Sequence, residues 1–451
     1  MKIFYGKCRL QLWLTCLVTS LWLLSCSDDQ TGGGQAYQPD QPIELESFSP
    51  KGGPIATQVI LKGKNFGTQI DEISVYFNEK QAAIISSTGD RMLVLAPKLP
   101  GEECVISVSI GDKKVQFDEV FDYVVQTTVS TLAGGIKGAS MPEGTGSLST
   151  AQFSQKPESS MAIDADNNLF VVFKDTPSGA SNRVYLMSEE AGSIKSLADI
   201  GVFLNVVLLS YDYVSNNVYW FNANIGEQGF SCFSRVSDYV SLEMGRVAWD
   251  KPLGYTEGMS SWGARSSFAM NPTDHKFYFY TNEGTAARFD PVTAKGENLT
   301  NDELKAAAGD VMGIVFDPRD NNISYFAVRG QHCIYKHNIA EGTCEVWAGR
   351  KNTSGYLDGA LDEAQFNAPC QMCADQEYIY VADRDNHCVR RITLATGYVS
   401  TIAGTAKSSG YANGPAEVSM FNGPTGLVID SEGILYVGDS GNYAIRRIAT
   451  E

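Results

Sequence analysis

Aromatic and planar polar side chains recur at matching positions in the C-terminal third of the chain. Two segments read GYLDG (Gly355–Gly359) and GYANG (Gly410–Gly414), and three others read RGQH, RDNH and SGNY. Aromatic faces stack on the C–H faces of a sugar ring, and planar polar groups match its hydroxyls. The candidate ligand-binding residues are therefore Arg329, His332, Tyr356, Asp358, Arg384, Asn386, His387, Tyr411, Asn413, Asn442 and Tyr443.

The same residues also have a structural interpretation. Asn-His and Asn-Tyr pairs before a strand can stabilise turns, and Asp and Gly can fix the geometry of a loop. Both interpretations stay open for each single residue. The hypothesis of a binding surface depends on the cluster as a whole.

Other chemistries have weaker patterns. His332 and His387 stand at equivalent positions, but the third equivalent position holds Tyr443, so three histidine ligands do not converge. The sequence contains no H-E-x-x-H, no G-x-S-x-G and no Gly-rich phosphate loop. We therefore predict no catalytic residue, no metal site and no cofactor.

Cysteines do not form a disulfide framework, because those beyond residue 26 are scattered and odd in number. The CxxC of Cys370 and Cys373 has redox or zinc spacing, but it falls in an expected strand and no second CxxC exists. Packing thiols are the better interpretation. The seven cysteines concerned are Cys104, Cys232, Cys333, Cys344, Cys370, Cys373 and Cys388.

The elements that must position the candidate residues are short strands. Residues Phe366–Gly404 contain four apolar, strand-length segments separated by turn residues, and Phe421–Ile448 repeats this pattern. The matching pairs are Phe366/Phe421, Pro369/Pro424, Asp375/Asp430, Tyr380/Tyr436, Asp383/Asp439, Asn386/Asn442 and Arg391/Arg447. This pattern resembles NHL repeats, which implies blades of a β-propeller. In such a fold the links between blades and the strand 2–3 loops open on the same face, where the candidate residues would converge.

Turn residues recur along residues 129–451 and predict six blades. Val129–Gly134 (VSTLAG) copies Val399–Gly404 (VSTIAG), whereas the last blade lacks a fourth strand. We expect this early strand to complete the last blade and close the ring. The turn residues are Asp164, Asp212, Asn271, Asp317, Asp375 and Asp430.

Residues 42–125 form a separate unit of alternating strands with Gly, Pro and Asn turns, which predicts a small β-sandwich. The turn Gly63-Lys64-Asn65-Phe66-Gly67, with Ser49-Pro50, Gly53-Pro54 and Tyr76-Phe77, resembles the immunoglobulin-like IPT/TIG family. The resemblance implies a spacer or interaction module. The expected fold is all-β, an immunoglobulin-like β-sandwich followed by a six-bladed β-propeller closed by an N-terminal strand.

The N-terminus has the layout of a secretory signal. Basic residues precede an apolar run, Leu12–Leu24, and Leu23-Leu24-Ser25-Cys26 resembles a bacterial lipobox. Ser27-Asp28-Asp29 resembles the tag that sends Bacteroidetes lipoproteins to the cell surface. We expect a signal peptide at 1–25, lipidation at Cys26 and a tether at 26–41, which place the protein on the outer face of the outer membrane.

The chain has a net charge of −17, which argues against nucleic acid as a partner. The leading hypothesis is a surface lipoprotein that captures a glycan for an uptake system, with an outer-membrane transporter as partner. One alternative is a propeller enzyme, a metal-dependent lyase or hydrolase. The other is a protein–protein scaffold or adhesin, for which a flat apolar face would be expected.

Overall fold

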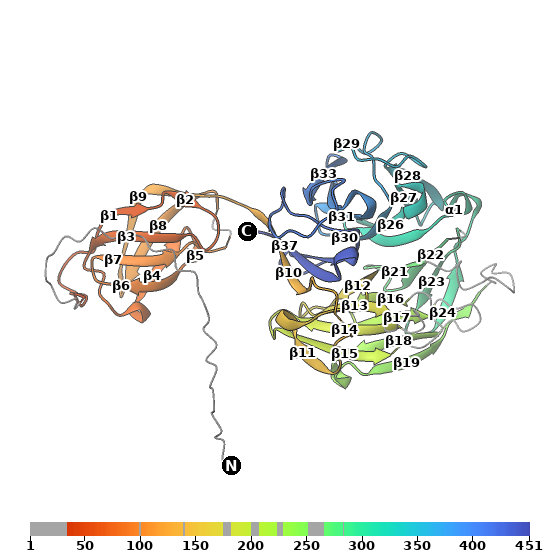
Figure 1. Cartoon of the computed structure of the whole chain (residues 1–451), viewed down its shortest axis with the longest axis horizontal. Coiled ribbons are helices and arrows are strands. Elements are labelled where there is room, and N and C mark those ends of the chain that lie inside the picture. Colours follow the sequence, from red (N-terminus) through yellow and green to blue (C-terminus); the bar gives the residue numbers. More distant parts are fainter. Residues whose placement is uncertain are drawn as a thin grey trace, which may run out of the picture. The chain divides into compact units, whose positions relative to one another are not determined.

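The computed structural model describes residues 34–98, 101–138, 140–174, 182–199, 207–222, 229–250, 266–282 and 284–451. Strands dominate these residues, and their only α-helix is the short α1 (Asp302–Ala306). The chain divides into two compact units, Met1–Tyr123 and Val124–Glu451 (Figure 1). The expected signal segment and Cys26 lie outside the described residues. No helix within the described ranges is long and apolar enough to cross a membrane.

The first unit is a sandwich of two sheets whose strands alternate between buried and exposed residues, as in Gln58–Lys64. The Asn65 turn residue adopts a φ of 62°, and its side chain bonds both the N–H and the carbonyl oxygen of Gln38. One sheet has the order β1 (Glu44–Ser49), β3 (Gln58–Lys64), β7 (Arg91–Leu95), β6 (Ala83–Ser87). The other has the order β2 (Gly52–Gly53), β9 (Lys113–Tyr123), β8 (Glu103–Ile110), β4 (Ile73–Phe77), β5 (Lys80–Gln81).

The described part of the second unit consists of six sheets, whose strands are antiparallel except for one short parallel pairing in the third sheet. We number the sheets in chain order of the strand that is named first for each. The first sheet contains β12 (Pro157–Ile163), β13 (Leu169–Lys174), β14 (Asn182–Ser188), β15 (Ser193–Asp199) and the short β11 (Thr145–Ser147). The second contains β16 (Val207–Asp212), β17 (Asn217–Asn222), β18 (Gly229–Ser234) and β19 (Ser241–Arg246). The third contains β21 (Ser266–Met270), β22 (Phe277–Thr281), β23 (Ala286–Asp290), β24 (Lys295–Asn298) and the short β20 (Ala248–Trp249).

The remaining three sheets repeat the arrangement. The fourth contains β25 (Val311–Asp317), β26 (Asp320–Val328), β27 (Cys333–Asn338) and β28 (Thr343–Ala348). The fifth contains β30 (Pro369–Ala374), β31 (Tyr378–Asp383), β32 (Cys388–Thr393), β33 (Tyr398–Ala403) and the short β29 (Gly359–Ala360). The sixth contains β35 (Pro424–Ile429), β36 (Leu435–Asp439), β37 (Ala444–Thr450), β10 (Thr127–Gly134) and the short β34 (Gly414–Pro415).

The first strand of each sheet packs against the first strand of the next, and β35 packs against β12. Side chains fix several of these contacts: Ser160 Oγ accepts the N–H of Leu209 (2.8 Å), and Ser210 Oγ accepts that of Met270 (3.1 Å). Gly313 is required because a Cβ there would lie 2.8 Å from the backbone of β30. This is a propeller-like arrangement.

The strand β10, at the start of the unit, pairs antiparallel with β37 at its end (Figure 1). Val129 lies opposite Ile448 and Gly134 opposite Ala444. This is the strand pairing that the repeated VSTLAG sequence predicts.

The turn between the first and second strands has the same construction in every sheet. The side-chain Oδ1 of one residue accepts the backbone N–H two positions further on, which confirms the predicted turn residues. They are Asp164, Asp212, Asn271, Asp317, Asp375 and Asp430.

Antiparallel order places the connections at two ends of the sheets. We call the end with the strand 1–2 and 3–4 turns the turn end. The other, with the strand 2–3 loops and the links between sheets, is the link end. In the last three sheets the strand 2–3 loop is a 3₁₀ turn, at Arg329–Gln331, Arg384–Asn386 and Ser440–Asn442.

Candidate functional site

The sequence-predicted residues lie at the link end, and the structure uses several of them to support the fifth sheet. Asn386 is buried, and its Nδ2 donates to the Gly355 oxygen (2.7 Å) and to Asp383 Oδ2 (2.8 Å). Arg390, fully buried, donates to Asp383 Oδ2 (2.8 Å) and to Asp358 Oδ1 (2.5 Å). Burial raises the pKa of Asp383 to about 6, while Arg390 opposes that rise.

The sixth sheet repeats the construction. Asn442 Nδ2 donates to the Gly410 oxygen and to Asp439 Oδ2, at 2.7 and 2.8 Å. The buried Arg446 donates to Asp439 Oδ2 (2.9 Å) and to Asn413 Oδ1 (2.6 Å). Asp358 and Asn413 therefore occupy matching places, where each accepts from an arginine that sequence reasoning did not single out. The sequence did contain a sign of these arginines, because an Arg-Arg pair recurs in the third strand of both sheets, at Arg390-Arg391 and Arg446-Arg447.

The two link tyrosines are anchored in the same way. Tyr356 Oη lies 2.8 Å from Thr401 Oγ1, and Tyr411 Oη lies 2.6 Å from Thr131 Oγ1. The Arg446 guanidinium lies 4.6 Å from the Tyr411 ring centroid. Tyr411 nevertheless stays 44% exposed, so one of the predicted aromatic surfaces is open to solvent.

His332, His387 and Tyr443 share a left-handed backbone conformation, with φ of 58°, 57° and 54°. His332 Nδ1 accepts the N–H of Ala368 (3.0 Å), and His387 Nδ1 accepts that of Gly423 (3.0 Å). Burial lowers the pKa of His332 below its ordinary value. Each histidine therefore joins the loop of one sheet to the link that leads into the next.

The two candidate arginines have carboxylate partners. Arg329 forms an ion pair with Asp310, and Arg384 Nη1 lies 3.1 Å from Asp385 Oδ1. All eleven predicted residues therefore lie at the link end of the unit. Many of their polar groups are hydrogen-bonded within the protein, and ligand binding there stays a prediction.

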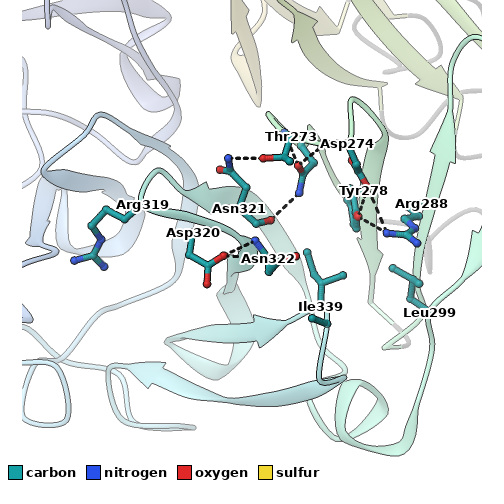
Figure 2. A pocket seen from close by; sticks show the side chains of 12 residues that line it. Thr273, Asp274, Tyr278, Arg288, Leu299, Arg319, Asp320, Asn321, Asn322 and Ile339 are labelled. Carbon is teal, nitrogen blue, oxygen red and sulfur yellow. Dashed lines mark hydrogen bonds and ion pairs between the residues drawn. The ribbon is translucent and has the colours of Figure 1, made fainter.

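The turn end contains a cavity of about 520 Å³ between the third and fourth sheets (Figure 2). Sequence reasoning did not identify it, because residues from two sheets form it. Apolar residues cover one part of the wall and polar turn residues the rest. The lining residues are Asn271, Thr273, Asp274, Tyr278, Arg288, Leu299, Arg319, Asp320, Asn321, Asn322, Ile339 and Ala340.

One substitution within the repeat explains how the cavity is built. Where the other sheets have an Asp turn residue, the third has Asn271, which carries an amide donor. Its Nδ2 donates to the Asn321 backbone oxygen (2.7 Å). Asn321 Nδ2 in turn donates to Thr273 Oγ1 (2.8 Å), as Figure 2 shows. These two bonds tie the turns of the third and fourth sheets together at the cavity.

A second polar group, Asp274, Tyr278 and Arg288, lies on the wall that the third sheet forms (Figure 2). Tyr278 Oη donates to Asp274 Oδ2 (2.7 Å) and accepts from Arg288 Nη1 (2.8 Å). Arg288 Nη2 also donates to Glu297 Oε2 (2.7 Å). Burial alone would raise the pKa of Glu297, but Arg288 and Lys276 outweigh burial and hold this pKa below its ordinary value. The wall therefore presents fixed charges of both signs.

Asn321 differs from the other lining residues. Its Oδ1 is buried and has no hydrogen-bond partner among the described residues. A buried acceptor without a donor costs about 1–3 kcal/mol. This oxygen is shielded from solvent, so a ligand in the cavity would reach it only if the Asn321 side chain moved.

The lining residues include no Ser, Cys or His, so they offer no pair of nucleophile and general base of the common kind. Within the described ranges, no cluster of three or more His, Cys, Asp and Glu residues could hold a metal ion. Cys370 and Cys373 are buried in β30 as free thiols, in agreement with the packing interpretation. The cavity can bind a polar molecule by hydrogen bonds and by contact with Leu299 and Ile339.

Comparisons with known families support both expected domain types. Residues 43–129 match the IPT/TIG domain, and residues 421–448 match the NHL repeat. Among curated proteins, the chain is 36% identical over 95 residues to Protein SUPPRESSOR OF QUENCHING 1, chloroplastic, of Arabidopsis thaliana. This match covers 21% of the chain and 9% of that protein. It is 34% identical over 100 residues to NHL repeat-containing protein 2 of Bos taurus, covering 22% of the chain and 14% of that protein.

Solved structures resemble almost the whole chain. An auxiliary nutrient binding protein from Bacteroides ovatus has a TM-score of 0.67 at 22% identity, over 92% of this chain and 100% of that one. A protein of unknown function from Bacteroides thetaiotaomicron has a TM-score of 0.60 at 23% identity, with the same coverage. An auxiliary nutrient binding protein from Bacteroides thetaiotaomicron has a TM-score of 0.58 at 23% identity, over 92% and 99%. At these identities the likeness shows a shared all-β, propeller-containing fold.

Proposed function

We propose that this protein is a surface lipoprotein that binds a hydroxyl-rich solute, a glycan, in the cavity at the turn end. The observation that supports this proposal is the cavity itself, which polar side chains line between two cross-linked turns. Fixed donors and acceptors with a small apolar wall suit a ring that carries several hydroxyls. The names of two similar solved structures, auxiliary nutrient binding proteins, agree with a binding role.

The cellular setting is part of the proposal. Leu23-Leu24-Ser25-Cys26 supports lipidation of Cys26, and Ser27-Asp28-Asp29 supports export to the outer face of the outer membrane. A lipid-anchored binding protein there would deliver its ligand to an outer-membrane transporter.

The finer architecture also belongs to the proposal. We infer that the six sheets are six blades of one closed ring, with β10 as the outer strand of the last blade. The pairing of β10 with β37 and the packing of β35 against β12 support this inference.

A glycan array probed with the soluble protein tests the function. Asp320 and Asn322 are exposed and bond each other (3.1 Å), so Asp320→Ala and Asn322→Ala should leave the fold intact. Each should weaken binding of a glycan hit by about 1–2 kcal/mol, the scale of one lost hydrogen bond to a ligand. Glu377→Ala, an exposed turn residue of the fifth sheet at the same end, is the matched control. Absence of any glycan hit would reject the function.

The link end is the second candidate site, favoured by the exposed ring of Tyr411. If it binds the glycan, Tyr356→Ala and Tyr411→Ala should each weaken binding by about 1–2 kcal/mol. Asp320→Ala would then leave the affinity unchanged. The two sets of variants therefore decide between the two ends.

A further inference from the structure

Lysines at the link end contact tyrosine rings. Elsewhere in the unit, Lys195 and Lys276 pair with Asp238 (2.8 Å) and Glu297 (3.2 Å). At the link end, four lysines have their Nζ 5.3–5.9 Å from a ring centroid: Lys137 and Lys156 (Tyr443), Lys351 (Tyr335) and Lys407 (Tyr356). None of the four pairs with a carboxylate of the described side chains.

Tyr443 is the ring that two lysines share. The Nζ atoms of Lys137 and Lys156 lie 5.3 and 5.8 Å from its centroid, and both lysines are exposed. Two ammonium groups near one ring repel each other, and each contact with the ring contributes about 0.5–1 kcal/mol at an exposed site. An anion that binds beside this ring is attracted by both ammonium groups.

The pair arises where the repeat changes. In the fifth and sixth sheets the residue before the first-strand proline donates its N–H to His332 or His387. The position equivalent to these histidines in the last loop is Tyr443, whose ring has no nitrogen to accept that bond. The residue before Pro157 is Lys156. The hydrogen bond between a histidine and the backbone is therefore absent at this position, where the Tyr443 ring and the Lys156 ammonium group stand instead.

An exposed aromatic surface lies beside the lysine pair. Gly135, two residues before Lys137, adopts a φ of 92°, and a Cβ there would lie 2.3 Å from Tyr411 Oη. The segment that carries Lys137 therefore packs directly against Tyr411, which is 44% exposed. A sugar ring can stack on such a tyrosine while its carboxylate reaches the lysines.

We propose that Lys137 and Lys156, held over Tyr443, bind the carboxylate of an acidic glycan, one that contains uronic acid. The chain carries a net charge of −17, so such a ligand is repelled by the molecule as a whole. A local pair of cations without carboxylate partners among the described residues is what overcomes that repulsion. This site is separate from the cavity at the turn end and does not depend on it.

Calorimetric titration with a hexamer of galacturonate tests the proposal, with maltohexaose as the neutral probe of equal length. We expect the wild type to bind the galacturonate hexamer saturably. The double variant Lys137→Gln/Lys156→Gln should bind it about tenfold more weakly, because it loses charge-assisted hydrogen bonds to the carboxylate. Lys80→Gln/Lys295→Gln removes the same charge from other exposed lysines and should leave the affinity unchanged. Tyr443→Phe should also bind normally, because the ring and not the hydroxyl contacts the lysines.

Three outcomes would overturn the proposal. The protein could bind maltohexaose as tightly as the galacturonate hexamer, or both double variants could lose the same affinity for the galacturonate hexamer. The protein could also bind phosphatidylglycerol vesicles more tightly than the galacturonate hexamer. The last would identify a membrane surface as the ligand. Binding of neutral glycans that Asp320→Ala weakens would meanwhile support the proposed function whatever the result for the lysines.

Discussion

Individual residues at the link end show how one side chain can look functional and be structural. Asp358 and Asn413 were predicted to face a ligand, yet each accepts a hydrogen bond from a fully buried arginine. The two arginines in turn pair with Asp383 and Asp439, which are also fully buried. Sequence spacing identified the recurring positions but not which of them face inward.

The buried ion pair of the sixth sheet should be essential for stability. Removing one partner of such a pair costs about 3–5 kcal/mol, because the other charge stays buried without compensation. We therefore expect Arg446→Met to lower the free energy of unfolding by this amount in denaturant titrations. Arg447→Met, its partly exposed neighbour, should cost about 1 kcal/mol or less. Equal effects of the two variants would contradict the structural role of Arg446.

His337 should make stability depend on pH. It is buried, with Nδ1 2.6 Å from Tyr280 Oη, and burial lowers its pKa from 6.5 to about 4. The unfolded chain therefore binds a proton more readily, and stability falls as the pH drops from about 6.5 to about 4. The loss should reach about 3 kcal/mol.

The variant His337→Gln isolates this effect, since it keeps a hydrogen-bonding side chain without titrating. Burial raises the pKa of Asp383 and Asp439, so protonation of these two carboxylates increases stability as the pH falls. This contribution is the same in the wild type and in His337→Gln, and it cancels in the difference between them. We expect the difference in unfolding free energy between wild type and variant to shrink toward acid pH. A constant difference between pH values of about 7 and 4 would contradict the prediction.

At the scale of elements, local sequence patterns predicted the strands and turns well. The Asp or Asn of each strand 1–2 turn bonds as expected, because this bond is made within three residues of the chain. The pairing of β10 with β37 was predictable because the repeat itself supplies the missing strand. The cavity was not, because Asn271 and Asn321 come from different sheets and only packing brings them together.

The strand β10 should be required for the stability of the whole second unit. Replacing Val129–Gly134 by a Gly-Ser segment of equal length removes the buried side chains of Val129 and Ala133 and weakens the pairing of this segment with β37. We expect thermal unfolding of the unit to shift to lower temperature, with a loss of at least about 3 kcal/mol. The same replacement in the exposed outer strand β11 should change little. An unchanged melting temperature would argue against a closed ring.

At the scale of the whole molecule, the proposed lipid anchor at Cys26 can be tested directly. Cys26→Ala should release the protein from the membrane fraction, and protease added to intact cells should digest the wild type. Ser27→Ala is a matched control that keeps the cysteine. Wild-type protein that is soluble, or fully protected from protease, would contradict the proposed location.

The most direct test of the central claim is a hydrogen-exchange footprint of a glycan hit on the intact protein. If the glycan occupies the cavity, peptides that cover residues 271–278 and 317–323 should become protected in the complex. Peptides from the links, residues 350–366 and 405–421, should exchange as in the free protein. Protection confined to those links would place the site at the link end, and the absence of protection in residues 271–278 and 317–323 would contradict binding in the cavity.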